Sequence, residues 1–279
     1  MTVAPDSTRP IGVFDSGVGG LSVLRALQVE LPQERFVYVA DNGHAPYGER
    51  DDAHVLSRSH AITDFLVEGH GIKALVVACN TATAAAIHAL RAAYPVLPIV
   101  GIEPALKPAT SLSKTGVIGV MATRGTLNSE KFRKLLENLH GTGTFVLQPC
   151  DGLADAIERF DTVRIQALCQ DYTRTMGRFG SASGEIDCLV LGCTHYAFVA
   201  TELATRVGNH IALLEGGVPV ARQTRRLLEQ AHPGMLNQDP LSMGQHAPIF
   251  YSTGNLNLLE SAVQRWLQLQ DKTVFQKLE

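Results

Sequence analysis

Short apolar runs rich in β-branched residues alternate along this chain with longer segments whose apolar residues recur every three or four positions. The short runs predict buried strands, and the longer segments predict amphipathic helices. Such alternation leaves few folds open, because each helix that links two parallel strands must cover a face of their sheet. We therefore expect an α/β fold of mostly parallel sheets with helices on both faces.

The runs place the elements at defined positions. Strands are predicted at 11–14, 36–40, 74–78, 99–102, 117–120, 144–147, 189–191 and 249–252. Helices are predicted at 21–30, 52–68, 83–93, 129–139, 164–178, 199–207, 218–230 and 256–269.

Two pairs of similar stretches indicate an internal repeat. "IGVFDSGVGGLS" at 11–22 resembles "IGVMATRGTLNS" at 118–129, and "ALVVACNTATAAA" at 74–86 resembles "CLVLGCTHYAFVA" at 188–200. Similar spacing within the two pairs indicates a duplicated unit and hence two related halves. The prolines and the Ser/Thr cluster of "GIEPALKPATSLSKTG" predict a loop between the halves. We therefore expect a cleft between the two halves.

Composition narrows the class of protein. The 279 residues, 45% of them hydrophobic, suffice for two domains of ordinary size. A formal net charge of -3 without a basic stripe argues against nucleic acid as the main ligand. The first ten residues do not resemble a secretory signal, and polar residues interrupt the longest apolar stretch, so we expect no membrane span.

The five cysteines are unevenly spaced, which favours reduced thiols in a cytosol. No CxxC or HxxxH pair occurs, so we expect no metal site. Cys79 and Cys193 each follow a predicted strand and precede a predicted helix. Ligands of parallel sheets bind at this edge, where a helix N-terminus favours a thiolate and can hold a small carboxylate. The alternative is that each cysteine fills a gap in the core.

Two other stretches supply polar groups. "DSGVGG" at 15–20 lacks both nucleotide-binding glycine patterns, and Asp15 at a strand end suits an ammonium group better than a phosphate. Asp15 could instead cap the following helix. "APYGER" at 45–50 offers Tyr47 and free backbone amides, although alone it reads as a turn.

The motifs "FDSGVGGLSVL", "PYGER", "VVACNTATAAA", "GVIGVMATRGT" and "LGCTHY" occur in an order that resembles the glutamate racemases of the aspartate/glutamate racemase family, from residue 11 to about residue 230. The resemblance implies two pseudo-symmetric three-layer α/β/α domains with the active site in the cleft between them. It also implies that the end of the chain returns to the first domain. We expect a first domain at 1–101 plus about 210–279, and a second at about 102–209.

The resemblance implies racemisation of L-glutamate and D-glutamate without a cofactor. Cys79 and Cys193 match the two acid/base residues, with Asp15 and His195 as assisting catalytic residues, and Glu158 matches a further acid behind them. The substrate-binding residues that it implies are Asp15, Ser16, Pro46, Tyr47, Gly48, Asn80, Thr81, Thr194 and His195. A bacterial cytoplasmic enzyme, most often a homodimer, that supplies D-glutamate for peptidoglycan is the expected setting.

Inversion without a cofactor gives a reason for two thiols. One base cannot easily reach both faces of the α-carbon, whereas two opposed groups of like chemistry can exchange roles. The remaining thiols, Cys150, Cys169 and Cys188, are assigned to packing.

The chain departs from the family pattern at several positions. "ADNGHAPYG" replaces a common A-D-T-A-R-x-P-Y-G, and Asp151 and Asp155 replace prolines before Glu158. Ala197 stands where a proline is usual, and "EGG" at 215–217 replaces a D-S-G. These changes leave the role of Glu158 open.

Three alternatives stay open. The enzyme could act on aspartate or a hydantoin, it could be a cysteine hydrolase that uses Cys193 with His195, or the protein could bind an amino acid without turnover. His195 could also be a structural histidine.

Overall fold

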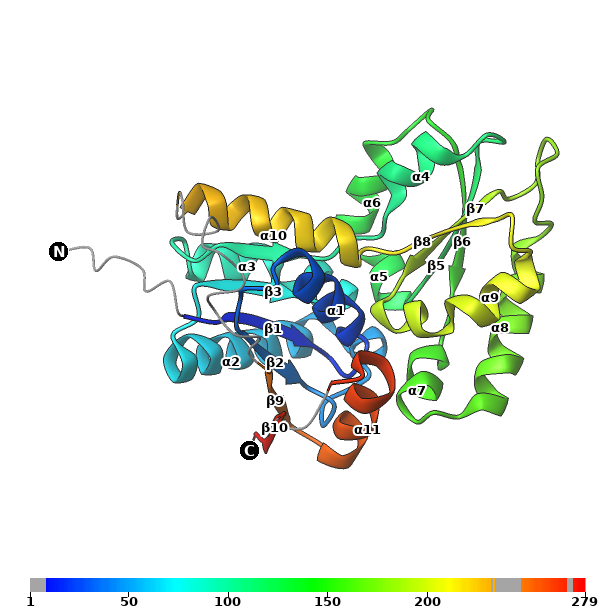
Figure 1. Ribbon diagram of the computed structural model, residues 1–279. Coiled ribbons are helices and arrows are strands. Elements are labelled where there is room, and N and C mark those ends of the chain that lie inside the picture. The colour runs from blue at the N-terminus through cyan, green and yellow to red at the C-terminus, as the bar shows by residue number, and fades with distance from the viewer. Residues whose placement is uncertain (1–8, 232, 234–246, 270–272, 279) are drawn as a thin grey trace.

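Two parallel sheets organise the chain, and each carries helices on both faces (Figure 1). The computed structural model describes residues 9–231, 233, 247–269 and 273–278; the remaining positions of the expected first domain lie outside the described residues. Every ladder between described strands is parallel, as expected.

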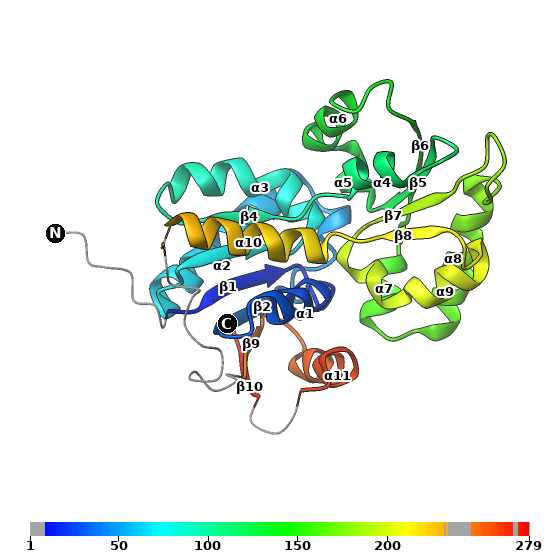
Figure 2. The ribbon, with the colours of Figure 1, turned by 45° about the horizontal axis from the view of Figure 1, so that its top comes forward.

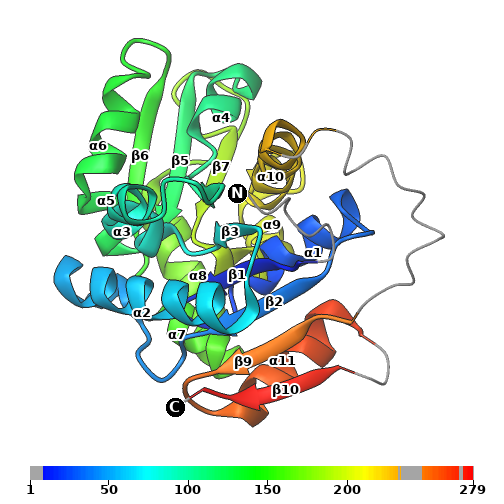
Figure 3. The ribbon, with the colours of Figure 1, turned by 90° about the vertical axis from the view of Figure 1, so that its left-hand side faces the viewer.

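The first sheet has the strand order β10-β9-β2-β1-β3-β4. Its strands are β1 (Ile11–Asp15), β2 (Phe36–Ala40), β3 (Ala74–Val77), β4 (Ile99–Gly101), β9 (Ile249–Ser252) and β10 (Val274–Lys277). The helices around it are α1 (Leu21–Glu30), α2 (Asp52–His70), α3 (Asn80–Ala93), α10 (Gly217–Ala231) and α11 (Leu256–Leu267), with a short 3-10 helix η1 (Tyr47–Glu49). Figure 3 shows β9 and β10 extending one edge of this sheet.

The second sheet has the order β6-β5-β7-β8. Its strands are β5 (Val117–Ala122), β6 (Thr144–Pro149), β7 (Cys188–Gly192) and β8 (Ala212–Leu214). Its helices are α4 (Leu106–Leu112), α5 (Arg124–Asn128), α6 (Glu130–Glu137), α7 (Leu153–Glu158), α8 (Thr162–Met176) and α9 (Ala200–Val207), with a 3-10 helix η2 (Thr194–Val199).

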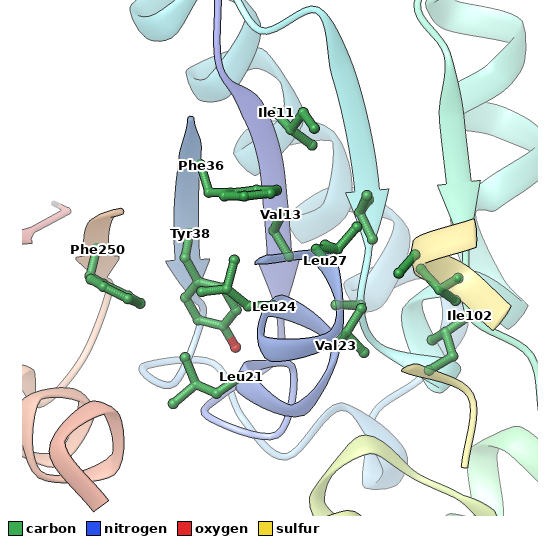
Figure 4. Packing of buried hydrophobic residues seen from close by; sticks show 14 of the residues in the cluster. Ile11, Val13, Leu21, Val23, Leu24, Leu27, Phe36, Tyr38, Ile102 and Phe250 are labelled. Atoms are coloured by element: carbon green, nitrogen blue, oxygen red, sulfur yellow. The ribbon is translucent and has the colours of Figure 1, made fainter. Parts of the chain in front are cut away.

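Four apolar clusters fill the spaces between sheets and helices. In the first sheet, side chains of β1 alternate between a core under α1, α10 and α11 and a core under α2 and α3. Figure 4 shows the former, where Val13, Tyr38 and Phe250 from three strands meet Leu24 of α1. The second sheet has one core under α7, α8 and α9 and another under α4 and α6. Each half is therefore a three-layer α/β/α unit, which confirms the expected fold class.

The two halves share one topology. The order β2-β1-β3-β4 in the first sheet matches β6-β5-β7-β8 in the second, so β1 corresponds to β5 and β3 to β7. This is the correspondence that the internal repeat predicts, and it brings the two cysteine stretches to equivalent strand ends.

The domain boundaries at residue 102 and about residue 210 stay a prediction. Sheet membership supports a return crossing a few residues later, because β8 still belongs to the second sheet. Leu228 of α10 already packs with Leu24 of α1 in the first core, and in Figure 2 α10 runs along the first sheet.

Two expectations about local structure were wrong or incomplete. The stretch at 101–116 is not a loop throughout, because α4 forms there; Pro108 is tolerated in its first turn, where backbone N–H groups have no helical partner. The strands β8 and β10 and the short helices α5 and α7 were also missed. None of the described helices is long and apolar enough to cross a membrane.

Candidate active site

A cavity of about 280 Å³ lies between the carboxyl ends of the two sheets. Both halves contribute to its wall, together with α11. The predicted site residues that line it are Ser16, Pro46, Tyr47, Gly48, Cys79, Asn80, Thr81, Glu158, Cys193, Thr194 and His195. Further lining residues include Asn42, Glu49, Thr123, Arg124, Cys150, Asp151, Asp155, Arg159, Asn255 and Leu258.

Cys79 and Cys193 occupy matching positions in this cavity. Each follows the central strand β3 or β7 and directly precedes a helical segment, α3 or η2. Both side chains are buried free thiols. Both also line the same cavity.

Cys79 lies in surroundings that favour the protonated thiol. Burial raises the pKa of Cys79 far above its usual range, and the nearby charge of Asp15 raises it further. The amide of Ala82 in the first turn of α3 donates to Cys79 Sγ at 3.4 Å, which opposes this shift. Cys79 Sγ also lies 3.7 Å from Ser16 Oγ. The structure therefore favours a thiol at this position.

Cys193 lies beside a buried cationic histidine. His195 Nδ1 is 3.6 Å from Cys193 Sγ, and His195 Nε2 is 2.6 Å from Glu158 Oε1. Burial lowers the pKa of His195, but its hydrogen bonds to Cys193 and Glu158 outweigh burial and leave that pKa well above the usual histidine range. The sulfur of Cys193 therefore lies beside a positive charge.

Glu158 is placed at the site although the residues around it differ from the family pattern. Its Oε1 accepts the Val18 amide at 2.7 Å as well as His195 Nε2. The two aspartates that replace prolines form ion pairs at the rim instead, Asp151 with Arg124 at 2.5 Å and Asp155 with Arg159 at 2.7 Å. The altered stretch therefore still delivers Glu158 to His195.

The glycines of "DSGVGG" are explained by close approach. A Cβ built on Gly17 would lie 1.8 Å from Glu158 Oε1, and one built on Gly19 would lie 2.3 Å from His195 Nδ1. Side chains there would displace both partners. The glycine loop of the first half is thus the surface on which the Glu158–His195 pair of the second half rests.

Asp15 is fully buried and does not line the cavity. It accepts the amides of Ser16 at 2.7 Å and Gly20 at 2.5 Å, and the Thr194 hydroxyl at 3.4 Å. Gly20 is the N-cap of α1, so Asp15 does support that helix start. Burial raises the pKa of Asp15, and Glu158 adds to this while His195 opposes it. Its direct contact with a substrate ammonium group stays a prediction.

The loop with Tyr47 is fixed from outside the cavity. Tyr47 donates to Asp41 Oδ2 at 2.5 Å, and Arg58 binds both oxygens of the same carboxylate at 2.8 and 3.0 Å. Burial raises the pKa of Tyr47 far above its usual range, with Asp41 adding to the shift, so Tyr47 remains a neutral donor. This arrangement presents the 45–49 segment as one wall of the cavity.

Sequence reasoning missed Thr123, which lies in the wall at the end of β5. Thr81 Oγ1 and Thr123 Oγ1 are 3.0 Å apart, and Thr123 caps α5 by accepting the Thr126 amide. The internal repeat holds the signal, since Thr123 in "IGVMATRG" aligns with Ser16 in "IGVFDSGV". Cys150, assigned to packing, is buried and also lines the cavity.

The described parts of the chain contain no group of three or more His, Cys, Asp or Glu side chains that could hold a metal ion. Asn80 Oδ1 is buried without a protein partner and lies in the cavity wall. An acceptor in that position is suited to an ammonium or hydroxyl donor of a ligand.

Comparison with known proteins shows which family the chain belongs to. A sequence profile described as Asp/Glu/Hydantoin racemase matches residues 11–231. The chain belongs to this racemase family. It is 44% identical over 259 residues to a glutamate racemase of Ectopseudomonas mendocina (strain ymp), a match that covers 92% of this chain and 94% of the relative. It is 48% identical over 223 residues to one of Pseudomonas paraeruginosa (strain DSM 24068 / PA7), covering 79% and 82%.

Solved structures of racemases share the fold. A glutamate racemase isoform of Bacillus anthracis superposes with a TM-score of 0.84 at 31% identity and covers 98% of each chain. The Escherichia coli glutamate racemase, solved with L-glutamate and the activator UDP-MurNAc-Ala, gives a TM-score of 0.80 at 29% identity and covers 97% of this racemase and 98% of its own chain.

Proposed function

We propose that this racemase interconverts L-glutamate and D-glutamate with Cys79 and Cys193 as its two bases and without a cofactor. The observation that carries the proposal is that two buried thiols, from equivalent strand ends of two matching sheets, line one cavity. The curated relatives and the solved structures named as glutamate racemases support the choice of substrate.

The unlike surroundings of the two sulfurs support different starting states in this proposal. Cys193, beside the His195 cation, is the thiolate that removes the α-proton of L-glutamate. The electron pair of the broken C–H bond stays on the α-carbon and its carboxylate. Cys79, held as a thiol, then delivers its proton to the opposite face and becomes the thiolate. The reverse sequence starts from D-glutamate with Cys79 as the base.

Stabilisation of the carbanionic intermediate falls to fixed donors. Amides at the start of α3 and the side chains of Asn80, Thr81 and Thr194 line the cavity where the α-carboxylate binds in this proposal. Donors that are already held in place reorganise little as charge develops, which lowers the barrier. Asp15 modulates the charge around Cys79 and Thr194 from behind.

The direct test incubates the purified protein with each enantiomer and follows both by chiral chromatography. We expect either enantiomer alone to approach an equal mixture without an added cofactor. L-aspartate and a 5-substituted hydantoin serve as matched substrates, and we expect slower conversion of both. Absence of glutamate racemisation, or faster racemisation of aspartate, would contradict the proposal.

We also propose that the enzyme works in a bacterial cytoplasm as a homodimer and supplies D-glutamate for peptidoglycan. The reduced state of the five described cysteines is compatible with such a compartment. Sedimentation analysis tests the dimer, and rescue of a strain that requires D-glutamate tests the cellular role.

A further inference from the structure

Three aromatic rings from the two halves meet at the junction between them, two of them stacked and the third tilted at 43°; they are called the aromatic stack below. The ring of Trp266 in α11 lies on that of Phe198 in η2, with centroids 3.7 Å apart and planes 3° from parallel. The ring of Phe160, which follows α7, lies 5.3 Å from Trp266. In Figure 1, α11 of the first half lies at the junction with the second half, close to α7.

The two phenylalanines belong to the segments that carry the Cys193 partners. Phe198 comes three residues after His195 in η2, and Phe160 comes two residues after Glu158. Trp266 and Phe198 pack against the α1 core of the first half and against the α8 core of the second half. One ring therefore braces both segments that form the His195–Glu158 contact.

The backbone at Phe160 adds a second observation. Phe160 has a φ of 55°, in the left-handed region where a bulky side chain is unfavourable and glycine is usual. The Arg265 guanidinium lies 5.4 Å from the Phe160 ring centroid, so the ring is held between two α11 side chains. This conformation closes the C-terminus of α7, where the Asp161 amide donates to the Ala156 carbonyl at 2.9 Å, and it directs the Phe160 ring to α11.

Cys79 has no share in this stack. It packs in the core under α2 and α3, on the other face of the first sheet, and none of the three aromatic residues belongs to that cluster. A loosened stack would therefore affect one of the two bases.

We propose that Trp266 is a positioning residue for the Cys193 half of the reaction, because its contacts with the rings of Phe198 and Phe160 keep Glu158 on His195 and His195 on Cys193. The proposal rests on the two-base glutamate racemisation proposed above. In this proposal α11 does more than complete the first domain, because it also sets the geometry of a proton-transfer group in the second half.

The test compares three substitutions with a matched control. Trp266→Ala removes the stack, Phe198→Leu keeps an apolar side chain without a ring, and Trp266→Phe restores an aromatic ring. Phe275→Ala is the control, since Phe275 stacks on Phe250 at 5.3 Å wholly within the first half. Circular dichroism melting of each variant separates loss of folding from loss of positioning.

We expect kcat to fall about 10- to 100-fold in Trp266→Ala and Phe198→Leu, since small displacements of a proton-transfer group have effects of that size. Trp266→Phe should recover most of the loss, and Phe275→Ala should stay near wild type. If Trp266→Ala does not fold, Phe198→Leu carries the same test.

Isotope effects separate positioning from general damage. With α-deuterated L-glutamate, slower removal by Cys193 makes bond cleavage more rate-limiting, so the isotope effect on kcat/KM rises. With α-deuterated D-glutamate, removal by Cys79 precedes the slowed step, so the isotope effect falls. Equal changes for the two enantiomers, or Trp266→Ala and Phe198→Leu rates within twofold of Phe275→Ala, would overturn the inference. A wild type that does not racemise glutamate would instead refute the proposed function.

Discussion

Residues at equivalent positions in the two halves have diverged in charge. Asp15 at the end of β1 aligns with Ala122 at the end of β5, and Thr81 after Cys79 aligns with His195 after Cys193. Near Cys79, the carboxylate of Asp15 adds to the effect of burial in raising the pKa of the thiol, whereas the His195 imidazolium lies 3.6 Å from the sulfur of Cys193. In the proposed mechanism, pseudo-symmetry supplies the two bases, and these substitutions decide which one starts charged.

The substitution Glu158→Gln tests whether Glu158 keeps His195 protonated. Loss of the negative charge lowers the pKa of His195, because Glu158 is one of the groups that raise it. We expect the alkaline limb of the kcat/KM–pH profile to move to lower pH, since the imidazolium is lost earlier as pH rises. We expect kcat to fall by about 100-fold, the lower range for a general acid–base group.

The pH profile should be measured between pH 6 and 10 for wild type and variant. Cys193, Glu158 and Asp15 are the titratable groups that act on or respond to His195. An alkaline limb that does not move would show that Glu158 does not set the charge of His195. Glu137→Gln, which makes the same change at an exposed ion pair with Arg133 away from the cavity, is the matched control.

Of the 24 lining residues, 11 were predicted from sequence, because they lie in motifs that resemble those of the racemase family. The environment of Glu158 could not be predicted. Its neighbours differ from the family pattern, and its contact with His195 joins residues 37 positions apart. The burial of Asp15 behind the cavity could not be predicted either, because a carboxylate side chain at a strand end can point into the cavity or away from it.

At the scale of elements, the glycine loop between β1 and α1 is the surface on which two halves meet. Gly19→Ala would place a methyl group 2.3 Å from His195 Nδ1 and 2.7 Å from Thr194 Oγ1. We expect displacement of His195 from Cys193 and a loss of kcat of about 100-fold, as for small misplacements of catalytic groups.

Gly69→Ala is the matched control for that substitution. Gly69 lies in α2, and a Cβ added there would lie 3.7 Å from its nearest neighbour, a Phe65 side-chain atom, which is an ordinary van der Waals distance. Alanine there should raise the free energy of unfolding by about 0.5–1 kcal/mol and leave kcat unchanged. Urea denaturation and racemisation assays measure both; a Gly19→Ala enzyme with wild-type kcat would contradict the close-approach explanation.

The elements that sequence analysis missed share a physical cause. The strands β8 and β10 lie at sheet edges and are only partly buried; β8 has just three residues, and half of the residues of β10 are polar. The helices α5 and α7 are too short for a clear period. The longer, buried elements were placed within a few residues because burial on one or both faces imposes a pattern.

For the whole molecule, the cavity exists only where the two halves meet, and its charges link function to stability. His195 has a raised pKa in the folded protein, so folding is favoured by its protonation. That contribution is present in full below about pH 6.5, the usual histidine pKa of an unfolded chain, and is lost as pH rises through the raised folded pKa.

His195→Gln tests this linkage. We expect the difference in free energy of unfolding between wild type and variant to shrink as pH rises above about 6.5, because the unfolded wild-type chain then releases the proton that folded His195 still holds. Guanidinium denaturation at several pH values between 6 and 9 measures the difference. A difference that grows with pH would show that His195 is buried in its neutral form.

The account depends on two thiols that act from opposite faces of one carbon. The most direct measurement incubates L-glutamate and D-glutamate separately in deuterium oxide with wild type, Cys79→Ser and Cys193→Ser, and follows deuterium at the α-carbon together with the enantiomer ratio. We predict that wild type incorporates deuterium into the product enantiomer and that each variant loses racemisation by at least about 100-fold. Full-rate racemisation by either variant would contradict the two-base assignment.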